Sequence, residues 1–208
     1  MPRYLLVITA FCTAAVFLYI TARYNYLLYH TLAETFSIVI AGGIFIVAWH
    51  TRAYVNNAYL VFLGIAYISV GCIDYFHTVS YKGMNVLAGE GSNTATQLWI
   101  GARYLEALAL LAAPFFLRRS PRPYPVLLFF FAVTTAFLAA VIGWGAFPDC
   151  YLEGEGLTPF KKVSEYVIIG ILFGAALNHR GSEDRLDADV YRLVIASIIT
   201  AIVSELCF

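Results

Sequence analysis

Charged residues are what this sequence has least of. Only 12% of its 208 residues are Asp, Glu, Lys or Arg, while 61% are hydrophobic. Soluble domains average about 25% charged and about 45–50% apolar residues, so the composition excludes an ordinary soluble domain. Lys plus Arg and Asp plus Glu both number 13, and there is no large basic block. The sequence therefore excludes nucleic acid as the expected partner.

Paired cysteines and the common catalytic motifs are also missing. The four cysteines form no CxxC pair, which excludes a sequence-specified zinc or redox motif. No HExxH pattern and no nucleophile–base arrangement of the hydrolase kind is present, so we expect no catalysis by this chain. Cys150 lies in a predicted loop and Cys207 near the end of a hydrophobic run. A disulfide between them is an open alternative to free thiols.

Long hydrophobic runs are what the sequence has in abundance. A helix needs about 20 apolar residues to cross the ~30 Å hydrocarbon layer, whereas membrane β-strands are runs of about ten residues with alternating polarity. The runs here are of the first kind. They predict an all-α, polytopic transmembrane helical bundle with about seven spans, near residues 4–22, 31–49, 58–78, 96–117, 124–145, 160–178 and 192–208.

The first hydrophobic run follows Met-Pro-Arg and resembles a signal peptide in its position. It is longer than a typical signal-peptide core of about 7–15 residues, which favours a retained helix. We therefore divide the chain into an N-terminal transmembrane anchor, residues 1–23, and a main membrane domain, residues 24–208.

The short loops differ in their content of Lys and Arg, which sets membrane orientation. Four basic residues lie on one side, namely Arg23, Lys82, Lys161 and Lys162. Eight lie on the side of the N-terminus, namely Arg3, Arg52, Arg118, Arg119, Arg122, Arg180, Arg185 and Arg192. This bias predicts a cytoplasmic N-terminus.

Most acidic residues fall on the other, outer side. Nine of the 13 lie in predicted outer loops or in the outer half of a span: Glu34, Asp74, Glu90, Glu106, Asp149, Glu153, Glu155, Glu165 and Glu205. The outer loop "FPDCYLEGEGLTPF" mixes aromatics and prolines with its charges, so we expect it to be ordered. This asymmetry is the most informative feature of the sequence.

Five of the predicted spans carry ionisable groups at the same depth. The groups are His30 and Glu34, Asp74 and His77, Arg103 and Glu106 with Gln97, then Glu165, and finally Glu205. The first three pairs are spaced i,i+3 or i,i+4, so each pair shares one helix face. A mid-bilayer Arg or Asp costs about 2.5–3.5 kcal/mol, so these faces should point inward. Arg103 lies roughly 10 Å into its span and should need an acidic partner, with Glu106, Glu165 and Glu205 as candidates.

Each polar residue also has a purely structural interpretation. His50 and His179 are interpreted as residues of the membrane interface, and Glu34 could simply favour the positive N-terminal end of its helix. The whole set, however, predicts an outer polar pocket. Acids outnumber arginine among its members, which favours a cation, a proton or a cationic ligand. His30, Glu34, Asp74 and His77 together are also compatible with a bound metal ion, since imidazole and carboxylate are transition-metal ligands.

Several stretches carry a resemblance to a known family. They are "LLYHTLAETFSIVIAGGIFIVAWHTR", "YLVFLGIAYISVGCIDYFHTVSYKGM", "ATQLWIGARYLEALALLAAPFFL", "FPDCYLEGEGLTPFKKVSEYVI" and "YRLVIASIITAIVSEL". From about Tyr24 to its last residue, the chain resembles the membrane-associated sensor domain of the third type, of the MASE family. The resemblance implies an N-terminal input domain of a bacterial signalling protein in the inner membrane, usually a histidine kinase and sometimes a diguanylate cyclase. It implies no particular ligand.

The family motifs coincide with most of the residues already singled out. They fall on His30, Glu34, Asp74, His77, Gln97, Arg103, Glu106, Asp149, Cys150 and Glu165. Tyr81 and Glu205 lie in the same stretches and complete the predicted ligand-binding set.

The resemblance also implies parts that this chain does not contain. Family members are similar in having an eighth span that leads to a cytoplasmic output domain, and such kinases usually work as dimers. Here no HAMP-like linker, kinase or GGDEF-type segment follows the seventh run, so we expect a truncated sensor domain.

Two other functions remain open from the sequence. Membrane acids and histidines also mark ion pathways, which favours an ion- or proton-coupled transporter, and Gly42-Gly43 could break a helix as in such proteins. The near absence of ionisable residues from the inner halves of the spans counts against it. An intramembrane metal-binding protein is the third alternative.

Overall fold

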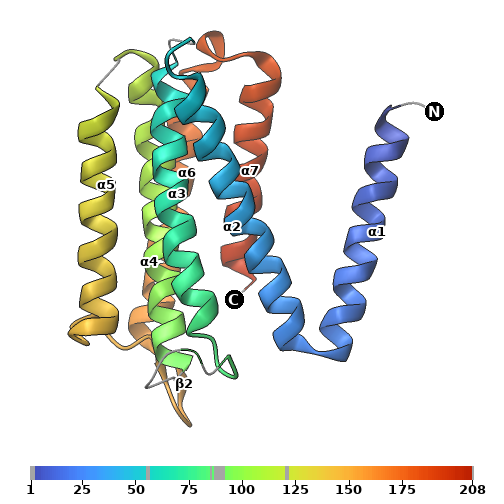
Figure 1. Ribbon diagram of the computed structural model, residues 1–208, viewed down its shortest axis with the longest axis vertical. Coiled ribbons are helices and arrows are strands. Elements are labelled where there is room, and N and C mark those ends of the chain that lie inside the picture. The colour runs from blue at the N-terminus through green and yellow to red at the C-terminus, as the bar shows by residue number, and fades with distance from the viewer. Residues whose placement is uncertain (1–2, 55–56, 85, 87–91, 120–121, 208) are drawn as a thin grey trace.

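The computed structural model describes residues 3–54, 57–84, 86, 92–119 and 122–207. Within them the chain forms seven α-helices that run alternately up and down (Figure 1). They are α1 (Arg3–Tyr24), α2 (Tyr26–Thr51), α3 (Ala58–Val79), α4 (Ser92–Ala112), α5 (Pro123–Leu138), α6 (Pro159–Arg180) and α7 (Ala188–Leu206). The predicted all-α bundle is therefore confirmed.

Shorter segments extend or join these helices. A 3₁₀ segment, Ala113–Leu117, continues α4, a π-helical turn, Ala139–Gly143, continues α5, and a 3₁₀ turn, Glu183–Arg185, precedes α7. The strands β1 (Tyr151–Leu152) and β2 (Gly156–Leu157) pair antiparallel in the loop before α6. We call this end of the bundle the hairpin end; it is the lower end in Figure 1. The loop that contains it is ordered, as the sequence predicts.

Side-chain caps define where the helices begin. The Asn25 side chain accepts a hydrogen bond from Leu28 N, so α2 starts five residues before the predicted span. Asn57 caps α3 and Thr158 caps α6 in the same way, each satisfying an orphan N–H of the first turn. Helix α2 continues through Gly42-Gly43 without a break. The broken helix that this pair suggested is therefore wrong.

Four helical segments are long and apolar enough to cross a membrane: Tyr26–Thr51, Ala58–Val79, Ser92–Leu117 and Pro123–Gly143. Helices α1, α6 and α7 contain 22, 22 and 19 residues. At 1.5 Å per residue, helices of that length extend roughly 28–33 Å, which matches the hydrocarbon layer. The total of seven spans stays a prediction.

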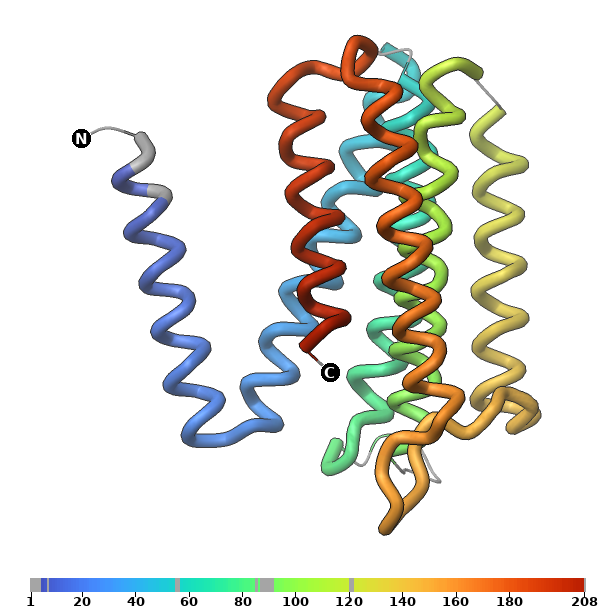
Figure 2. Tube along the Cα trace, turned by 180° about the vertical axis from the view of Figure 1, so that it is seen from behind, coloured from blue at the N-terminus to red at the C-terminus, as the bar shows by residue number. Residues whose placement is uncertain are grey.

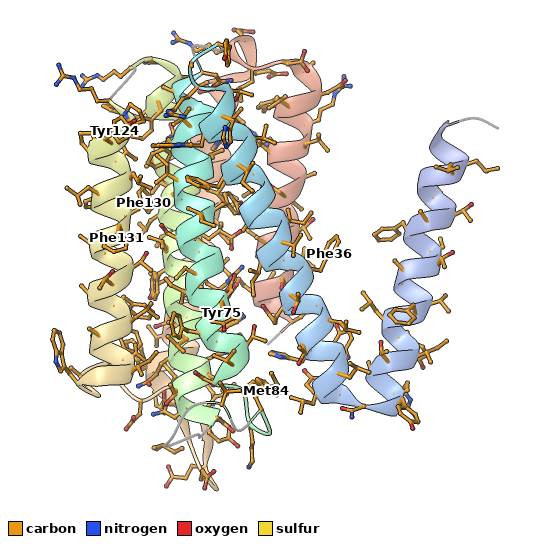
Figure 3. The ribbon with its side chains drawn as sticks, in the orientation of Figure 1. Phe36, Tyr75, Met84, Tyr124, Phe130 and Phe131 are labelled. Atoms are coloured by element: carbon orange, nitrogen blue, oxygen red, sulfur yellow. The ribbon has the colours of Figure 1, made fainter. Side chains whose placement is uncertain are left out.

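Large apolar side chains cover the outside of the bundle, as expected for lipid contact. Phe36 on α2 and Phe131 on α5 are 69% and 66% exposed. Phe130, the neighbour of Phe131, is instead buried against Phe62 of α3 (Figure 3).

Helix α3 forms the centre of the bundle and packs against α2, α4 and α5. Its glycines allow the closest approach: a Cβ added at Gly64 or Gly71 would lie 2.6 or 3.0 Å from the Cβ of Ala48 or Ala41 on α2. Helix α4 also packs on α6, and α6 on α7. The packing of α2 against α3 and of α4 against α6 determines which polar side chains can meet.

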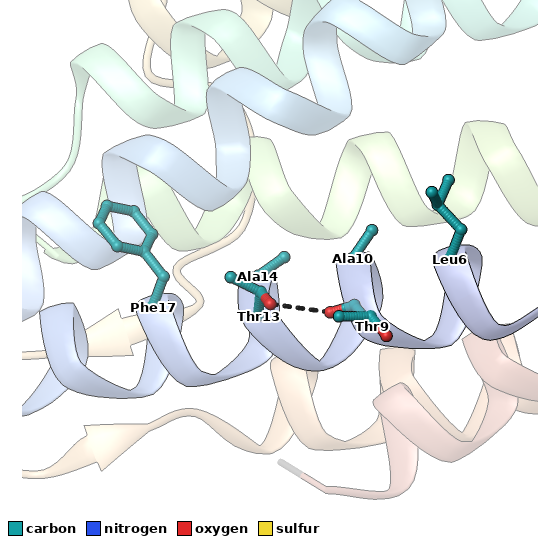
Figure 4. Close-up of a pocket in the computed structure, with 6 residues that line it drawn as sticks. All are labelled: Leu6, Thr9, Ala10, Thr13, Ala14 and Phe17. Atoms are coloured by element: carbon teal, nitrogen blue, oxygen red, sulfur yellow. Dashed lines mark hydrogen bonds between the residues drawn. The ribbon is translucent and has the colours of Figure 1, made fainter. Parts of the chain in front are cut away.

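Helix α1 lies apart from the bundle and contacts α2 (Figure 2). A groove of about 660 Å³ runs along it, lined by Leu6, Thr9, Ala10, Thr13, Ala14 and Phe17 (Figure 4). Its hydroxyls are used within the helix, since Thr13 Oγ1 donates to Thr9 O at 2.8 Å. The groove is apolar and none of the residues that line it is ionisable, so we place no site there. The division of the chain at residue 23 stays a prediction.

Candidate functional site

Arg103 of α4 lies at the centre of a network of acids. Its Nη2 donates to both carboxylate oxygens of Asp74 on α3, at 3.1 and 3.0 Å, and its Nη1 donates to Glu106 Oε2 at 2.5 Å. The Tyr67 hydroxyl donates to the other oxygen of Glu106 at 3.3 Å. Hydrogen bonds between ionised groups are stronger than hydrogen bonds between neutral groups. Arg103 has the acidic partner that the sequence requires.

The identities of the partners differ in part from those predicted. Glu106 was among the candidates, but the second partner is Asp74 rather than Glu165 or Glu205. Glu165 instead pairs with Lys161, which lies one helical turn earlier on α6. Lys161 also lies over the Trp99 ring, 4.8 Å from its centroid. The sequence placed Lys161 on the outer side; the Thr158 cap places it in the first turn of α6, at the hairpin end, where its side chain is buried.

Two further carboxylates reach this region from the remaining helices. Glu205 on α7 is buried and interacts electrostatically with Arg103 and Glu165, while its Oε2 has no hydrogen-bond partner among the described residues. Glu34 on α2 interacts electrostatically with Asp74 and Arg103. We call the seven charged residues the polar network: Glu34, Asp74, Arg103, Glu106, Lys161, Glu165 and Glu205. Five helices contribute to it.

A pair of histidines lies next to the polar network, toward the hairpin end. His77 Nε2 and His30 Nε2 are 3.3 Å apart, and His77 Nδ1 donates to the carbonyl oxygen of Ala95 at 2.7 Å. His30 Nε2 lies 3.9 Å from Glu34 Oε1, and the Tyr81 ring stacks on the His30 ring at 3.9 Å between centroids. Tyr81 lies just beyond α3, where burial raises the pKa of its hydroxyl and keeps it protonated.

Three residues of this region are close enough to share a metal ion. One ligand atom each from His30, Glu34 and His77 lies within 4.8 Å of the other two. Asp74, the fourth predicted ligand, is not in this group. Its carboxylate faces the guanidinium of Arg103, because Asp74 and His77 are three residues apart on α3 and the former lies deeper in the bundle.

The other predicted site residues hold the loop of the hairpin end. Gln97 Nε2 donates to the carbonyl oxygens of Phe147 and Pro148 at 2.9 and 3.0 Å. Asp149 accepts a hydrogen bond from Asn93 at 2.7 Å, while Asn93 Oδ1 accepts from the backbone N–H of Cys150 at 2.8 Å. These contacts show a structural use for Gln97, Asp149 and Cys150, and their part in ligand binding stays a prediction.

Cys150 itself is buried, and burial raises the pKa of its thiol to about 11. The other cysteines, Cys12, Cys72 and Cys207, are exposed, and all four thiols are free. The Cys150–Cys207 disulfide that the sequence left open is therefore absent from the described residues.

His179 corrects another interpretation. It is fully buried rather than interfacial: its Nδ1 donates to Ala175 O at 2.9 Å, and its Nε2 lies 3.1 Å from the Tyr59 hydroxyl. His50 is exposed, as expected for an interfacial residue. Glu90, counted among the outer acids, lies outside the described residues.

Asn93, Lys161 and Tyr67 were missed by reasoning from the sequence. Asn93 and Tyr67 are not ionisable at neutral pH, so a search for charges passes over them. Lys161 follows a proline at a helix start, where a charged residue is usually interfacial. Its i,i+4 spacing to Glu165 was the signal that could have found it.

Comparison with known proteins agrees with this arrangement of membrane helices. Residues 21–208 match the model of one family, described as a membrane-associated sensor domain and designated MASE3. No curated protein and no solved structure matches the chain. The matched region contains α2 to α7 and every residue of the polar network. The chain therefore belongs to the MASE3 family of membrane-associated sensor domains and is a sensory input domain of the membrane.

Proposed function

We propose that this domain senses a cation or a cationic ligand at the polar network and passes the signal to a cytoplasmic output domain. In this proposal the chain is the input part of a bacterial inner-membrane signalling protein, with a histidine kinase as the output. The N-terminus lies in the cytoplasm and the hairpin end faces outward. The proposed parent protein works as a homodimer and has an eighth span that returns the chain to the cytoplasm.

The observation that carries the proposal is the excess of acid in the polar network. Five carboxylates meet two basic side chains there, and both basic side chains already have carboxylate partners. Burying a carboxylate without a partner is costly, and more so within a membrane. Glu34 and Glu205 are the carboxylates without a direct ion pair to Arg103 or Lys161 among the described contacts. A proton or a cation would lower that cost.

The network also links the helices that would transmit the signal. Arg103 interacts with acids on α3, α4 and α7, so a new positive charge near Glu34 or Glu205 alters the balance of attractions on its guanidinium. A ligand shifts a conformational equilibrium only through different affinities for the two states. Here the states differ in which carboxylates Arg103 holds, and α7 carries the difference toward the output domain.

The test measures autophosphorylation of the full-length parent protein in membrane vesicles. Asp74→Asn and Glu205→Gln each remove one negative charge at constant size, and we expect either to change output severalfold while membrane insertion stays normal. Asp189→Asn is the matched control, because Asp189 forms an exposed pair with Arg192 at the other end of the bundle. Normal output from both network variants would remove the network from signalling. A coding sequence without any output domain would overturn the kinase part of the proposal.

A further inference from the structure

The two histidines next to the polar network are arranged as ligands rather than as a packed pair. His30 and Glu34 are one turn apart on α2, and His77 lies in the last turn of α3. A tetrahedral metal ion with nitrogen ligands at about 2.0–2.1 Å holds those nitrogens roughly 3.3–3.4 Å apart. The two Nε2 atoms are 3.3 Å apart. Their spacing already fits two adjacent corners of such a site.

The hydrogen bond of His77 fixes which nitrogen is available. A backbone carbonyl can only accept, so the 2.7 Å contact with Ala95 O places the proton of a neutral His77 on Nδ1. The lone pair on Nε2 then points at His30. Metal-bound histidines commonly hold their other ring N–H in this way, which orients the ring and raises the basicity of the ligand atom. His77 therefore has the support expected of a metal ligand.

His30 is held by stacking instead of by a hydrogen bond through Nδ1. Its Nδ1 is buried and has no hydrogen-bond partner among the described residues. If Nε2 of neutral His30 donates to His77, the Nδ1 lone pair is left buried without a donor. If Nδ1 carries the proton, two Nε2 lone pairs face each other at 3.3 Å. A cation between the two Nε2 atoms removes that repulsion, because it accepts both lone pairs while the proton of neutral His30 stays on Nδ1.

Glu34 supplies the third donor and the negative charge. Its Oε1 is 3.9 Å from His30 Nε2, so a small rotation of the side chain brings it within ligand distance of the same point. Two imidazoles and one carboxylate suit divalent ions of intermediate softness and disfavour Mg²⁺ and Ca²⁺, which take oxygen ligands. We propose that His30, Glu34 and His77 bind a divalent transition-metal ion such as Zn²⁺, with a fourth position open to water or a further ligand.

The chain beyond α3 covers this site on the side of the hairpin end. Tyr81 stacks on His30, and Met84 Sδ lies 3.7 Å from the hydroxyl of Thr31, the residue after His30. Met84 lies at the lower end of α3 in Figure 3. Gly83 has φ +100°, a conformation that favours glycine and turns the chain back toward Leu27 of α2. Tyr81 and Met84 thus lie against α2 beside the two histidines.

The metal site deepens the proposed function and depends on it only for the signalling role. Glu34 already interacts electrostatically with Asp74 and Arg103. A metal ion that draws Glu34 toward the histidines weakens the attraction between Glu34 and Arg103 and adds positive charge near the guanidinium. The ion would thus act on the polar network through the one residue that both have in common.

Metal binding is tested on the purified full chain in detergent, without a histidine tag. Calorimetry measures the affinity for Zn²⁺ and elemental analysis the number of ions bound. The visible absorption of bound Co²⁺ reports the coordination geometry in the unmutated chain. We expect about one ion per chain and a tetrahedral or five-coordinate Co²⁺ spectrum, the geometries of such three-ligand sites. His77→Ala and Glu34→Gln should each weaken binding by more than the roughly 10–100-fold caused by losing an outer hydrogen-bond partner. His50→Ala is the control on the same helix and should bind normally.

Failure of the metal site can be told apart from failure of the proposed sensing function. An octahedral Co²⁺ spectrum typical of the hydrated ion, or equal Zn²⁺ affinity in His77→Ala and His50→Ala, would overturn the metal site whatever the kinase assay shows. Specific binding that the ligand variants abolish supports the site. If that binding then leaves autophosphorylation of the parent unchanged, the site stands and its part in sensing falls. Size-exclusion profiles of each variant show that the lost binding is not lost folding.

Discussion

Each end of the bundle buries a histidine that faces another ring, Tyr59 beside His179 at one end and His30 beside His77 at the other, and the two arrangements differ in how their polar atoms are satisfied. At one end, both ring nitrogens of His179 have partners, Ala175 O and the Tyr59 hydroxyl, and the residue is fully buried. At the hairpin end, His77 and His30 face each other through Nε2, and His30 Nδ1 has no partner among the described residues. The first arrangement is complete by itself, whereas the second is not.

The comparison teaches that burial of a histidine does not mark a site. His179 is more buried than His77, yet its hydrogen bonds give it a role in holding α3 and α6 together. What distinguishes His30 and His77 is that their ring nitrogens can still act as metal ligands, and that they lie beside an excess of negative charge. Changes beside His179 should therefore affect stability alone, whereas changes beside His30 and His77 should also affect ligand binding.

The largest effect is expected from removing the guanidinium group of Arg103, which balances the negative charge of the polar network. Arg103→Leu leaves Asp74 and Glu106 without their partner, and breaking a buried ion pair in this way costs about 3–5 kcal/mol. We expect a large loss of thermal stability in detergent, measured by fluorescence-detected size exclusion over a temperature series. Arg103→Lys should recover only part of the loss, because the single ammonium group of lysine cannot reproduce the bonds to both oxygens of Asp74 and to Oε2 of Glu106. Wild-type stability of Arg103→Leu would show that the network is not buried from water.

The next effect concerns the close packing that places the two histidines together. Gly71→Leu puts a side chain where a Cβ alone would lie 3.0 Å from that of Ala41. Overpacking of this kind costs about 1–3 kcal/mol. Because the helices must separate nearest His77, we also expect weaker Zn²⁺ binding, measured by calorimetry. Gly43→Leu on α2 is the control, since a Cβ there meets nothing within 4 Å. Equal behaviour of the two variants would contradict a role for this contact.

Much of the fold could be predicted from the sequence, because membrane helices are specified by composition. A run of about 20 apolar residues has few alternatives to a helix, since backbone groups cannot be left unsatisfied in lipid. The alternation of helix direction then fixes which residues share an end. It placed Asp74, Arg103 and Glu205 in one region, where the structure has them.

The pairing inside that region could not be predicted, because it depends on helix rotation and close approach. Asp74 and His77 are neighbours on one face in the sequence, yet Asp74 contacts Arg103 while His77 contacts His30. Lys161 was not predicted as a member of the polar network, although its i,i+4 spacing to Glu165 indicates the pair. Sequence spacing identified most of the charged participants and left their partners open.

A smaller effect is expected at the end of the bundle where His179 lies. Tyr59→Phe removes the hydroxyl that faces His179 Nε2, and a single buried hydrogen bond contributes about 1 kcal/mol. We expect a slight loss of thermal stability and no change in Zn²⁺ affinity. A double-mutant cycle with His179→Phe measures the coupling between the two side chains directly. Altered Zn²⁺ affinity in Tyr59→Phe would break the distinction between a structural and a ligand-binding histidine pair.

The last prediction concerns reactivity rather than stability and tests whether the hairpin end is closed. Burial raises the pKa of the Cys150 thiol to about 11, so the proton is held more tightly in the folded state. Any stability that this contributes is present below about pH 9 and is lost as pH rises through about 11. Since the thiolate is the reactive form, alkylation should keep rising with pH to that point, whereas an ordinary thiol reaches its plateau near its pKa of about 8.5.

The measurement follows iodoacetamide labelling by mass spectrometry in a chain where Cys12, Cys72 and Cys207 are serine. Asn93→Ala is the informative partner variant, because Asn93 Oδ1 accepts from the N–H groups of Cys150 and Tyr151 at 2.8 and 3.0 Å. Loss of these two hydrogen bonds should expose the thiol and make labelling faster at neutral pH. The pH at which the labelling rate reaches its plateau should move toward the pKa of an ordinary thiol. A plateau near pH 9 in the unmodified loop would mean that water reaches Cys150. The loop that holds Cys150 would then be open to water at the hairpin end.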